Sequence, residues 1–194
     1  GKLTPVAPEK HVTVMLHFET GNTLYFQDTR KFGRMEYVNN PMEKLAHLGP
    51  EPLADDFTPE VFYKMLRSKN RQIKPLLLDQ TFLAGLGNIY VDEALFQAGI
   101  QPLSIAASIP KRQSMSLHAA IQSILSASIK AQGTTILNFS HGENESGTYQ
   151  AALHVYGGKD EPCLVCETPI TKITVGQRGT HFCSSCQSLF KAKR

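Results

Sequence analysis

The sequence predicts an α+β fold in which strands come first, helices follow and a small metal-binding hairpin ends the chain. Three observations predict it. The chain before about residue 38 has short β-branched runs, residues 56–132 place apolar side chains at helical spacing, and all four cysteines lie between Cys163 and Cys186. Strands followed by helices are typical of the α+β class or of separate domains. We therefore expect three regions, bounded at 1–50, 51–150 and 151–194.

The first region predicts a small sheet. Residues 11–18 form one expected strand and residues 23–26 its partner, with a turn between them. A loop over residues 28–33 carries two cations and a phenylalanine, and a further short strand is expected over residues 34–38. A sheet of two or three strands rarely stands alone, so we expect its strands to need partners that this chain does not contain.

The second region predicts four helices. Thr58 followed by a proline is a helix start, and further helices are expected near residues 73–78 and over residues 88–98. Pro110 begins a long helix that ends at Gly133. The predicted buried side chains are Val61, Phe62, Met65, Leu66, Ile89, Val91, Leu95, Phe96, Leu117, Ala120, Ile121, Ile124, Leu125 and Ile129.

The cysteines form two Cys-x2-Cys pairs, Cys163 with Cys166 and Cys183 with Cys186, separated by sixteen residues. Two such pairs flanking a short hairpin are typical of a tetrahedral thiolate zinc site. A segment of about 30 residues has too little apolar area to fold alone, so we expect the metal to supply its folding free energy. Two disulfides or free thiols are the alternative. Four thiolates leave no open coordination position, so the zinc is predicted to be structural.

Between the cysteine pairs, residues 176–179 are predicted to form a tight loop that presents Arg178 at a hairpin tip. Glycine lets a backbone approach another surface closely, and an arginine at such a tip suits a phosphate. A solvated surface arginine is the alternative interpretation.

A glycine-rich turn, Gly85-Leu86-Gly87-Asn88, directly precedes the helix expected over residues 88–98. The amides of such a turn and of a helix N-terminus both favour an anion. Three cations lie a short way upstream, namely Lys69, Arg71 and Lys74. A Gly-x-Gly often only separates two helices, but together with the basic run and the cysteine hairpin it indicates binding to a DNA backbone.

The bulk composition sets few limits on function. A formal net charge of +3 permits a nucleic-acid partner without requiring one. No stretch of the sequence approaches the roughly 20 apolar residues of a membrane helix, and the first residues form no signal peptide. We therefore expect a soluble intracellular protein with no membrane partner.

Six blocks of the chain resemble formamidopyrimidine-DNA glycosylases and occur in the family's order. They are Asp28-Thr29-Arg30-Lys31-Phe32-Gly33, His47-Leu48-Gly49-Pro50-Glu51-Pro52, Lys74-Pro75-Leu76-Leu77-Leu78-Asp79-Gln80, Gly85-Leu86-Gly87-Asn88-Ile89-Tyr90-Val91-Asp92-Glu93-Ala94-Leu95, Arg178-Gly179-Thr180-His181-Phe182-Cys183 and the four cysteines. The resemblance covers essentially the whole chain, and the match to the related endonuclease VIII branch is poorer.

The resemblance implies part of an N-terminal β-sandwich in residues 1–50, a helix–two-turn–helix DNA-binding domain in 51–150 and a zinc finger in 151–194. It implies an enzyme of base-excision repair that removes oxidised purines, such as 8-oxoguanine and formamidopyrimidines, and then cleaves the strand at the abasic site. The implied cofactor is one structural Zn²⁺, and the implied partner is double-stranded DNA with an oxidised purine or abasic site. A monomer associated with the nucleoid in a bacterial cytoplasm is expected.

The resemblance also implies roles for single residues. The expected DNA contacts are His11, Arg30, Phe32, Lys69, Lys74 and Asn88. Arg30 and Phe32 resemble the wedge that fills the gap left by a flipped base, and Lys74 and Asn88 resemble phosphate clamps. Arg178 resembles the finger arginine that donates a proton in the final elimination step. Residues 140–149 resemble the loop that closes over the flipped base, and their composition is that of a mobile loop.

One feature departs from the family pattern. Family members begin Pro-Glu, with the proline amine as the nucleophile, whereas this chain begins Gly1-Lys2-Leu3, which resembles an interior strand. We therefore expect the first domain to be truncated and this chain alone to be catalytically inert. The alternatives are a stand-alone zinc-dependent DNA-binding module without enzymatic activity and a structural zinc ribbon that docks another protein.

Overall fold

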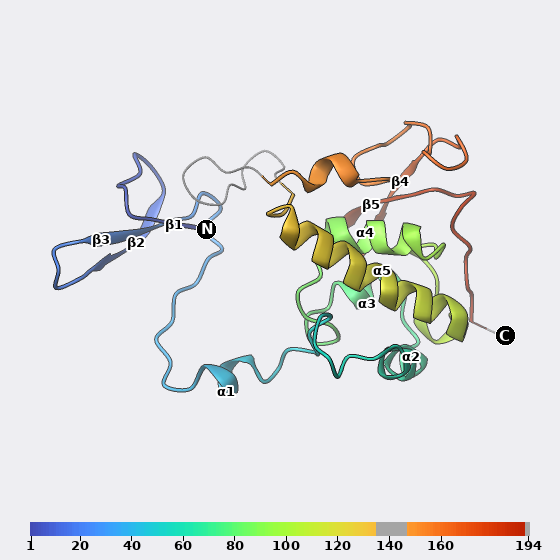
Figure 1. Ribbon diagram of the computed structural model, residues 1–194, viewed down its shortest axis with the longest axis horizontal. Coiled ribbons are helices and arrows are strands. Elements are labelled where there is room, and N and C mark those ends of the chain that lie inside the picture. The colour runs from blue at the N-terminus through green and yellow to red at the C-terminus, as the bar shows by residue number, and fades with distance from the viewer. Residues whose placement is uncertain (135–146, 193–194) are drawn as a thin grey trace. The chain divides into compact units, whose positions relative to one another are not determined.

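The computed structural model describes residues 1–134 and 147–192 and divides into two compact units, Gly1–Ala46 and His47–Arg194 (Figure 1). The further division of residues 51–194 into two regions stays a prediction. In chain order the helices and strands are β1 (Lys2–Thr4), β2 (Val12–His17), β3 (Thr23–Gln27), α1 (Pro41–Leu45), α2 (Pro59–Arg67), α3 (Ile73–Leu77), α4 (Asn88–Gln97), η1 (Ala106–Ser108), α5 (Lys111–Lys130), η2 (Tyr149–Ala152), β4 (Thr171–Val175) and β5 (Arg178–Phe182).

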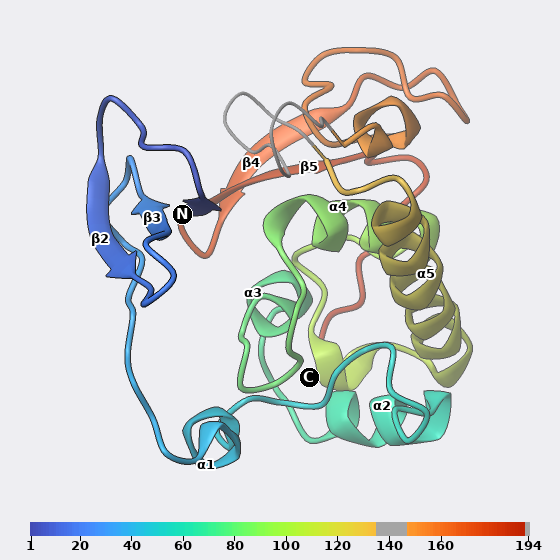
Figure 2. The ribbon, with the colours of Figure 1, turned by 60° about the vertical axis from the view of Figure 1, so that its left-hand side comes forward.

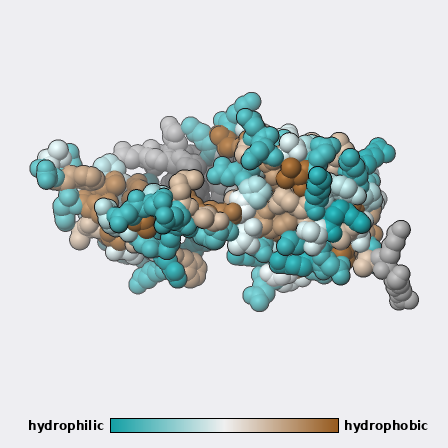
Figure 3. All heavy atoms as spheres, turned by 90° about the horizontal axis from the view of Figure 1, so that it is seen from below, coloured by the Kyte–Doolittle hydropathy of each residue, from teal (hydrophilic) through white to brown (hydrophobic). Residues whose placement is uncertain are grey.

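The first unit is a three-stranded antiparallel sheet in the order β1-β3-β2. The predicted hairpin is confirmed, with Met15 of β2 opposite Tyr25 of β3. The strand expected over residues 34–38 is wrong, because β1 takes the second edge of β3. Strand β1 agrees with the resemblance of Gly1-Lys2-Leu3 to an interior strand. Large apolar side chains of this unit stay exposed, and they interrupt the hydrophilic surface in Figure 3.

The predicted helix starts of the second unit are confirmed. The Thr58 hydroxyl accepts a hydrogen bond from the amide of Val61 at 3.3 Å, and Pro59 occupies the first turn of α2. Helix α4 begins at Asn88 directly after Gly87, and α5 begins directly after Pro110. No helix in the described ranges is both long and apolar enough to cross a bilayer.

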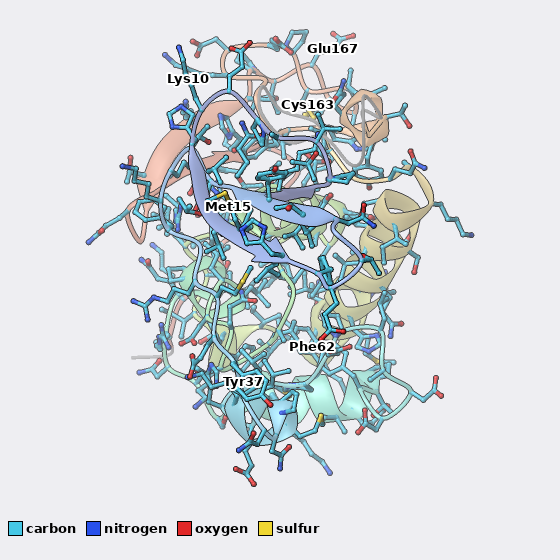
Figure 4. All side chains as sticks on the ribbon, turned by 90° about the vertical axis from the view of Figure 1, so that its left-hand side faces the viewer. Lys10, Met15, Tyr37, Phe62, Cys163 and Glu167 are labelled. Atoms are coloured by element: carbon cyan, nitrogen blue, oxygen red, sulfur yellow. The ribbon has the colours of Figure 1, made fainter. Side chains whose placement is uncertain are left out.

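Helix α4 is the centre of the second unit, where it packs on α5, α3 and β5 (Figure 2). Every residue from Val91 to Phe96 is buried. The main core joins α2 to α5, with Phe62 and Leu117 fully buried, while a smaller cluster surrounds the cysteines. Figure 4 shows Phe62 among the helices and Cys163 at the opposite end of this unit.

Most of the predicted core is buried, but Ile129 is 65% exposed and Val61 is 39% exposed. Each step of four residues turns a side chain by about 40° around a helix, so Ile129 lies about 80° from the direction of Ile121. Ser128, seven residues after Ile121, stays within about 20° of that direction and is buried in its place.

Candidate nucleic-acid interface and zinc site

The four cysteine sulfurs lie within 4.8 Å of one another. The Sγ atoms of Cys166 and Cys183 are 3.4 Å apart, and those of Cys163 and Cys186 are 3.9 Å apart. A disulfide requires about 2 Å, so these are free thiols and the disulfide alternative does not apply. Zinc–sulfur bonds of about 2.3 Å in a tetrahedron separate the sulfurs by about 3.8 Å. The cluster therefore fits one structural Zn²⁺.

Local hydrogen bonds give the thiols different acidities. The hydroxyl and amide of Thr168 lower the pKa of the Cys166 thiol to about 6. Burial raises the pKa values of the Cys183 and Cys186 thiols. The Gln187 side chain accepts a hydrogen bond from the amide of Cys183 at 2.8 Å and donates one to the carbonyl of Ile100 at 2.8 Å. Zinc needs all four thiolates, so metal binding releases protons from this buried cluster.

Strands β4 and β5 are joined by a two-residue turn, Gly176-Gln177. Both turn residues have positive φ, +55° and +63°, as a type I′ turn requires. The predicted four-residue loop is therefore too long, because the ladder already begins with Val175 opposite Arg178. Arg178 is the first residue of β5 and its side chain is exposed. A Cβ atom at Gly176 would lie 3.1 Å from Pro75 Cγ, so glycine allows the turn to approach α3 closely.

Lys74 is placed differently from the predicted phosphate clamp. Its side chain is 0% exposed, and its ammonium lies 2.6 Å from Asp92 Oδ1 and 3.1 Å from the carbonyl oxygen of Gly179. Both groups of the ion pair are buried in the second unit. Burial lowers the pKa of Lys74 and raises the pKa of Asp92 to about 6, and each partner opposes the shift of the other.

Asn88 connects the start of α4 to the finger strand. Its Nδ2 atom donates a hydrogen bond to the carbonyl of Gly179 at 3.0 Å, next to Arg178. Among the described residues, no side chain caps α4, so the amides of its first turn have no side-chain partner there. The structure thus brings Asn88 close to the backbone next to Arg178, whereas the sequence analysis expected Asn88 to act together with Lys74. Lys69 is exposed just beyond the end of α2.

The three remaining predicted contacts lie in the first unit around Asp28. The Asp28 carboxylate accepts hydrogen bonds from the amides of Arg30 at 3.2 Å and Gly33 at 2.6 Å, and the amide of Asp28 donates to the carbonyl of His11 at 2.9 Å. The Gly33 amide contributes most to lowering the pKa of Asp28. The loop presents an exposed Arg30 and Phe32, and 81% of Phe32 is exposed.

Sequence reasoning missed the roles of two carboxylates in α4. Asp92 pairs with Lys74, and Glu93 accepts hydrogen bonds from the amides of His154, Val155 and Tyr156 at 2.8 to 2.9 Å. The available signal was two adjacent acids in an otherwise apolar helix that contains no cation, because such acids need partners from elsewhere. The predicted closing loop falls mainly on residues 140–146, outside the described residues.

Comparison with known proteins places two family models on the chain. The formamidopyrimidine-DNA glycosylase H2TH domain matches residues 48–140, and the zinc finger found in FPG and IleRS matches residues 160–189. The chain is 46% identical over 190 residues to the formamidopyrimidine-DNA glycosylase of Cytobacillus firmus, covering 96% of this chain and 69% of that protein. The corresponding protein of Bacillus licheniformis is 45% identical over 184 residues, covering 92% of this chain and 66% of the relative.

A solved structure also resembles the chain. The complex between Lactococcus lactis FPG (MutM) and a Fapy-dG containing DNA aligns with a TM-score of 0.84 and 38% identity, covering 96% of this chain and 70% of that one. The chain thus spans about two thirds of the length of these relatives, 66% of the Bacillus licheniformis protein.

Proposed function

The chain belongs to the formamidopyrimidine-DNA glycosylase family, and from this membership we propose that it acts in base-excision repair by binding double-stranded DNA at oxidised purines and abasic sites. The similar Lactococcus lactis structure is a complex with a Fapy-dG containing DNA, which supports this choice of partner. The matched relatives are bacterial, so the nucleoid is the proposed place of action.

The observation that carries the proposal is the shared carbonyl of Gly179. Asn88 at the start of α4 binds this carbonyl, and Arg178 precedes it in β5. A helix N-terminus and an exposed guanidinium both favour phosphate, and here one backbone group joins the elements that present them. We assign phosphate contacts to Asn88 and Arg178, and to Arg178 also the proton donation of the elimination step.

The first unit would contribute the contacts beside the lesion. Phe32 is an apolar ring with 81% of its surface exposed, which suits insertion into a base stack. His11 and Arg30 of this unit are exposed and suit phosphate contacts, as does the exposed Lys69 of the second unit. The proposed reaction is release of the oxidised purine followed by strand cleavage.

The testing experiment measures affinity by fluorescence anisotropy. Two duplexes of one sequence are compared, one with a tetrahydrofuran abasic analogue and one undamaged. The chain should prefer the damaged duplex, and Arg178→Ala should lower the slope of log affinity against log salt by about 0.9, the value of one phosphate contact. Lys130→Ala, an exposed cation at the end of α5, is the matched control. Equal affinity for both duplexes would contradict the proposal.

A second measurement separates the enzyme from a DNA-binding module. Release of 8-oxoguanine and strand cleavage are followed on a duplex that carries this base. Turnover excludes the stand-alone zinc-dependent module and overturns the expectation that this chain alone is catalytically inert. Lesion-selective binding without turnover agrees with that expectation, and borohydride trapping of the full-length protein on the same duplex then separates the enzyme from the module.

A further inference from the structure

The outer edge of β5 is bound by side chains instead of a third strand. Strand β5 pairs with β4 on one side. Gly179 and His181 are two residues apart, so their backbone groups face the same edge of the strand. On that edge the Gly179 carbonyl accepts from Lys74 Nζ at 3.1 Å, and the His181 amide donates to Asp92 Oδ2 at 2.9 Å. The ion pair thus binds one acceptor and one donor of β5, as a neighbouring strand would.

The same ion pair is fully enclosed. Lys74 and Asp92 are both 0% exposed, and their charged atoms are 2.6 Å apart. A buried ion pair is a poor device for stability alone, because a well-packed apolar pair commonly serves as well or better. What the pair adds is geometric specificity, since each of its hydrogen bonds forms only when β5 lies at one register and one distance from the helices. This chemistry favours a role in placing the strand.

Arg178 lies between two anchored points of the hairpin. On one side the Gly176 turn approaches α3, where an added Cβ would lie 3.1 Å from Pro75 Cγ. On the other side Gly179 is held by Lys74 and by Asn88. The position of the Arg178 backbone relative to α4 is therefore fixed by groups in α3 and α4, and not by the zinc cluster alone.

We infer that Asp92 and Lys74 are positioning residues whose buried ion pair holds β5 on α4, so that Arg178 and Asn88 meet the DNA backbone at a fixed spacing. The inference deepens the proposed function and depends on it. Both side chains are fully buried, so in this inference each acts through the backbone of β5.

The test combines Asp92→Asn with Arg178→Ala in a double-mutant cycle. Asp92→Asn keeps the shape of the side chain but removes its charge and one acceptor. It should retain bound zinc, speed hydrogen exchange of the His181 amide at least tenfold and weaken binding to the abasic-analogue duplex about tenfold, the loss expected for a hydrogen bond to a charged group. The salt slope should fall by about 0.9, as in Arg178→Ala. The double variant should bind no more weakly than Arg178→Ala alone.

Two further variants keep the test decisive. Lys74→Met with Asp92→Leu replaces the pair by apolar groups and removes the risk of one unpaired buried charge. This double variant should fold, bind zinc and show the same loss of affinity and slope. Glu60→Gln makes a matched charge change on the exposed surface of α2 and should leave affinity within about twofold, since surface charges act weakly.

The outcomes of these experiments distinguish failure of the positioning role from failure of the proposed DNA-binding function. Lesion-selective binding in which the effects of Asp92→Asn and Arg178→Ala add overturns the positioning role and leaves the proposed function standing. If Asp92→Asn speeds hydrogen exchange of the His181 amide but leaves DNA affinity unchanged, the positioning role is likewise overturned and the proposed function stands. A wild-type chain that does not distinguish the two duplexes overturns the proposed function itself.

Discussion

Single side chains decide how the finger hairpin meets the helices. Lys74 and Asp92 are enclosed completely, so the free energy of unfolding depends on keeping both charges together. Asn88 and Gly176 act on the same hairpin through one hydrogen bond and one close approach. Each of these contacts joins residues far apart in the sequence.

Lys74→Met should lower the free energy of unfolding by about 3–5 kcal/mol, because it leaves the Asp92 carboxylate buried without a partner. Chemical denaturation at neutral pH measures the change. Lys74→Met with Asp92→Leu should recover most of the loss. A single variant as stable as the wild type would contradict this cost, because it would mean that Asp92 is not a buried, unpaired carboxylate in the variant.

The pH dependence of stability should report on Asp92. Burial raises its pKa from the ordinary 3.8 to about 6, so the folded state holds this proton more tightly than the unfolded chain. The contribution of this group to stability therefore decreases as the pH rises from about 4 to about 6 and is constant above. Between about pH 4 and pH 6, the stability of the wild type relative to Asp92→Asn should fall by at most about 1.4 kcal/mol per pH unit. A difference that is flat over this range would contradict the raised pKa.

The burial of Lys74 could not be predicted from the sequence. Its position after two other cations, Lys69 and Arg71, indicated a basic surface, and local spacing carries no information about partners at positions 92 and 179. Arg178 was predicted correctly as an exposed residue near a hairpin tip, because the flanking glycine and cysteine pairs define that turn locally. Ligand residues close in sequence are predictable, whereas a buried network between distant segments is not.

Among the elements of the second unit, the zinc-binding hairpin depends on the smaller of the two core clusters. Its cysteines pack with Phe96, Val155 and Ile170, apart from the main cluster between the helices. The helices begin at strong local signals, such as Thr58 before Pro59 at α2, and these were predictable. Strand β1 was indicated by the family resemblance alone, since three residues carry too little periodicity and the partner strand follows more than twenty residues later.

Removal of zinc should unfold the hairpin and spare the helices. Cys163→Ser or a chelator should abolish hydrogen-exchange protection in β4 and β5 and most of the DNA affinity, because the metal supplies the folding free energy of this segment. Far-UV circular dichroism should retain the signal of α2, α4 and α5. Ser184→Ala, between the second pair of ligands, is the matched control. Unchanged DNA binding without zinc would refute the prediction.

Gly176→Ala should destabilise the finger by more than the ~1 kcal/mol that a positive φ costs a non-glycine residue, because the new Cβ would also press on Pro75 at 3.1 Å. Gly157→Ala is the control, since its φ is +90° and no atom lies within 4 Å of the added Cβ. Thermal unfolding of both variants measures the difference. Equal effects would mean that Pro75 moves aside freely.

The whole molecule consists of two units with unequal cores. Every buried apolar side chain among the described residues lies in the second unit, while the first unit buries only Thr4 and Asp28. The sequence anticipated this difference, because it predicted a small sheet that lacks strand partners. How much of the longer relatives' first domain corresponds to this sheet could not be read from strand patterns alone.

Limited trypsin digestion should therefore cut first at Arg34, which is exposed and outside the helices and strands, and leave a stable C-terminal fragment. Residues 32–38 belong to no helix or strand and hold few buried groups, so their local unfolding costs little free energy. Mass spectrometry identifies the fragment. Earlier cleavage inside α5 would contradict the assignment of the core.

The hydrogen bonds that Lys74 and Asp92 make to the outer edge of β5 have a consequence for exchanging the zinc-binding hairpin among relatives. Lys74 and Asp92 bind the hairpin through the backbone carbonyl of Gly179 and the backbone amide of His181, and the His181 ring also lies 3.7 Å from Asp92 Oδ2. A Cβ at Gly179 would meet Lys172 no closer than 3.7 Å, an ordinary contact. A transplanted finger could thus differ at position 179 and still seat correctly, provided that its turn keeps a glycine and that it keeps His181. The helices of the recipient protein supply the charged side chains of this contact, and the hairpin supplies a backbone carbonyl and a backbone amide.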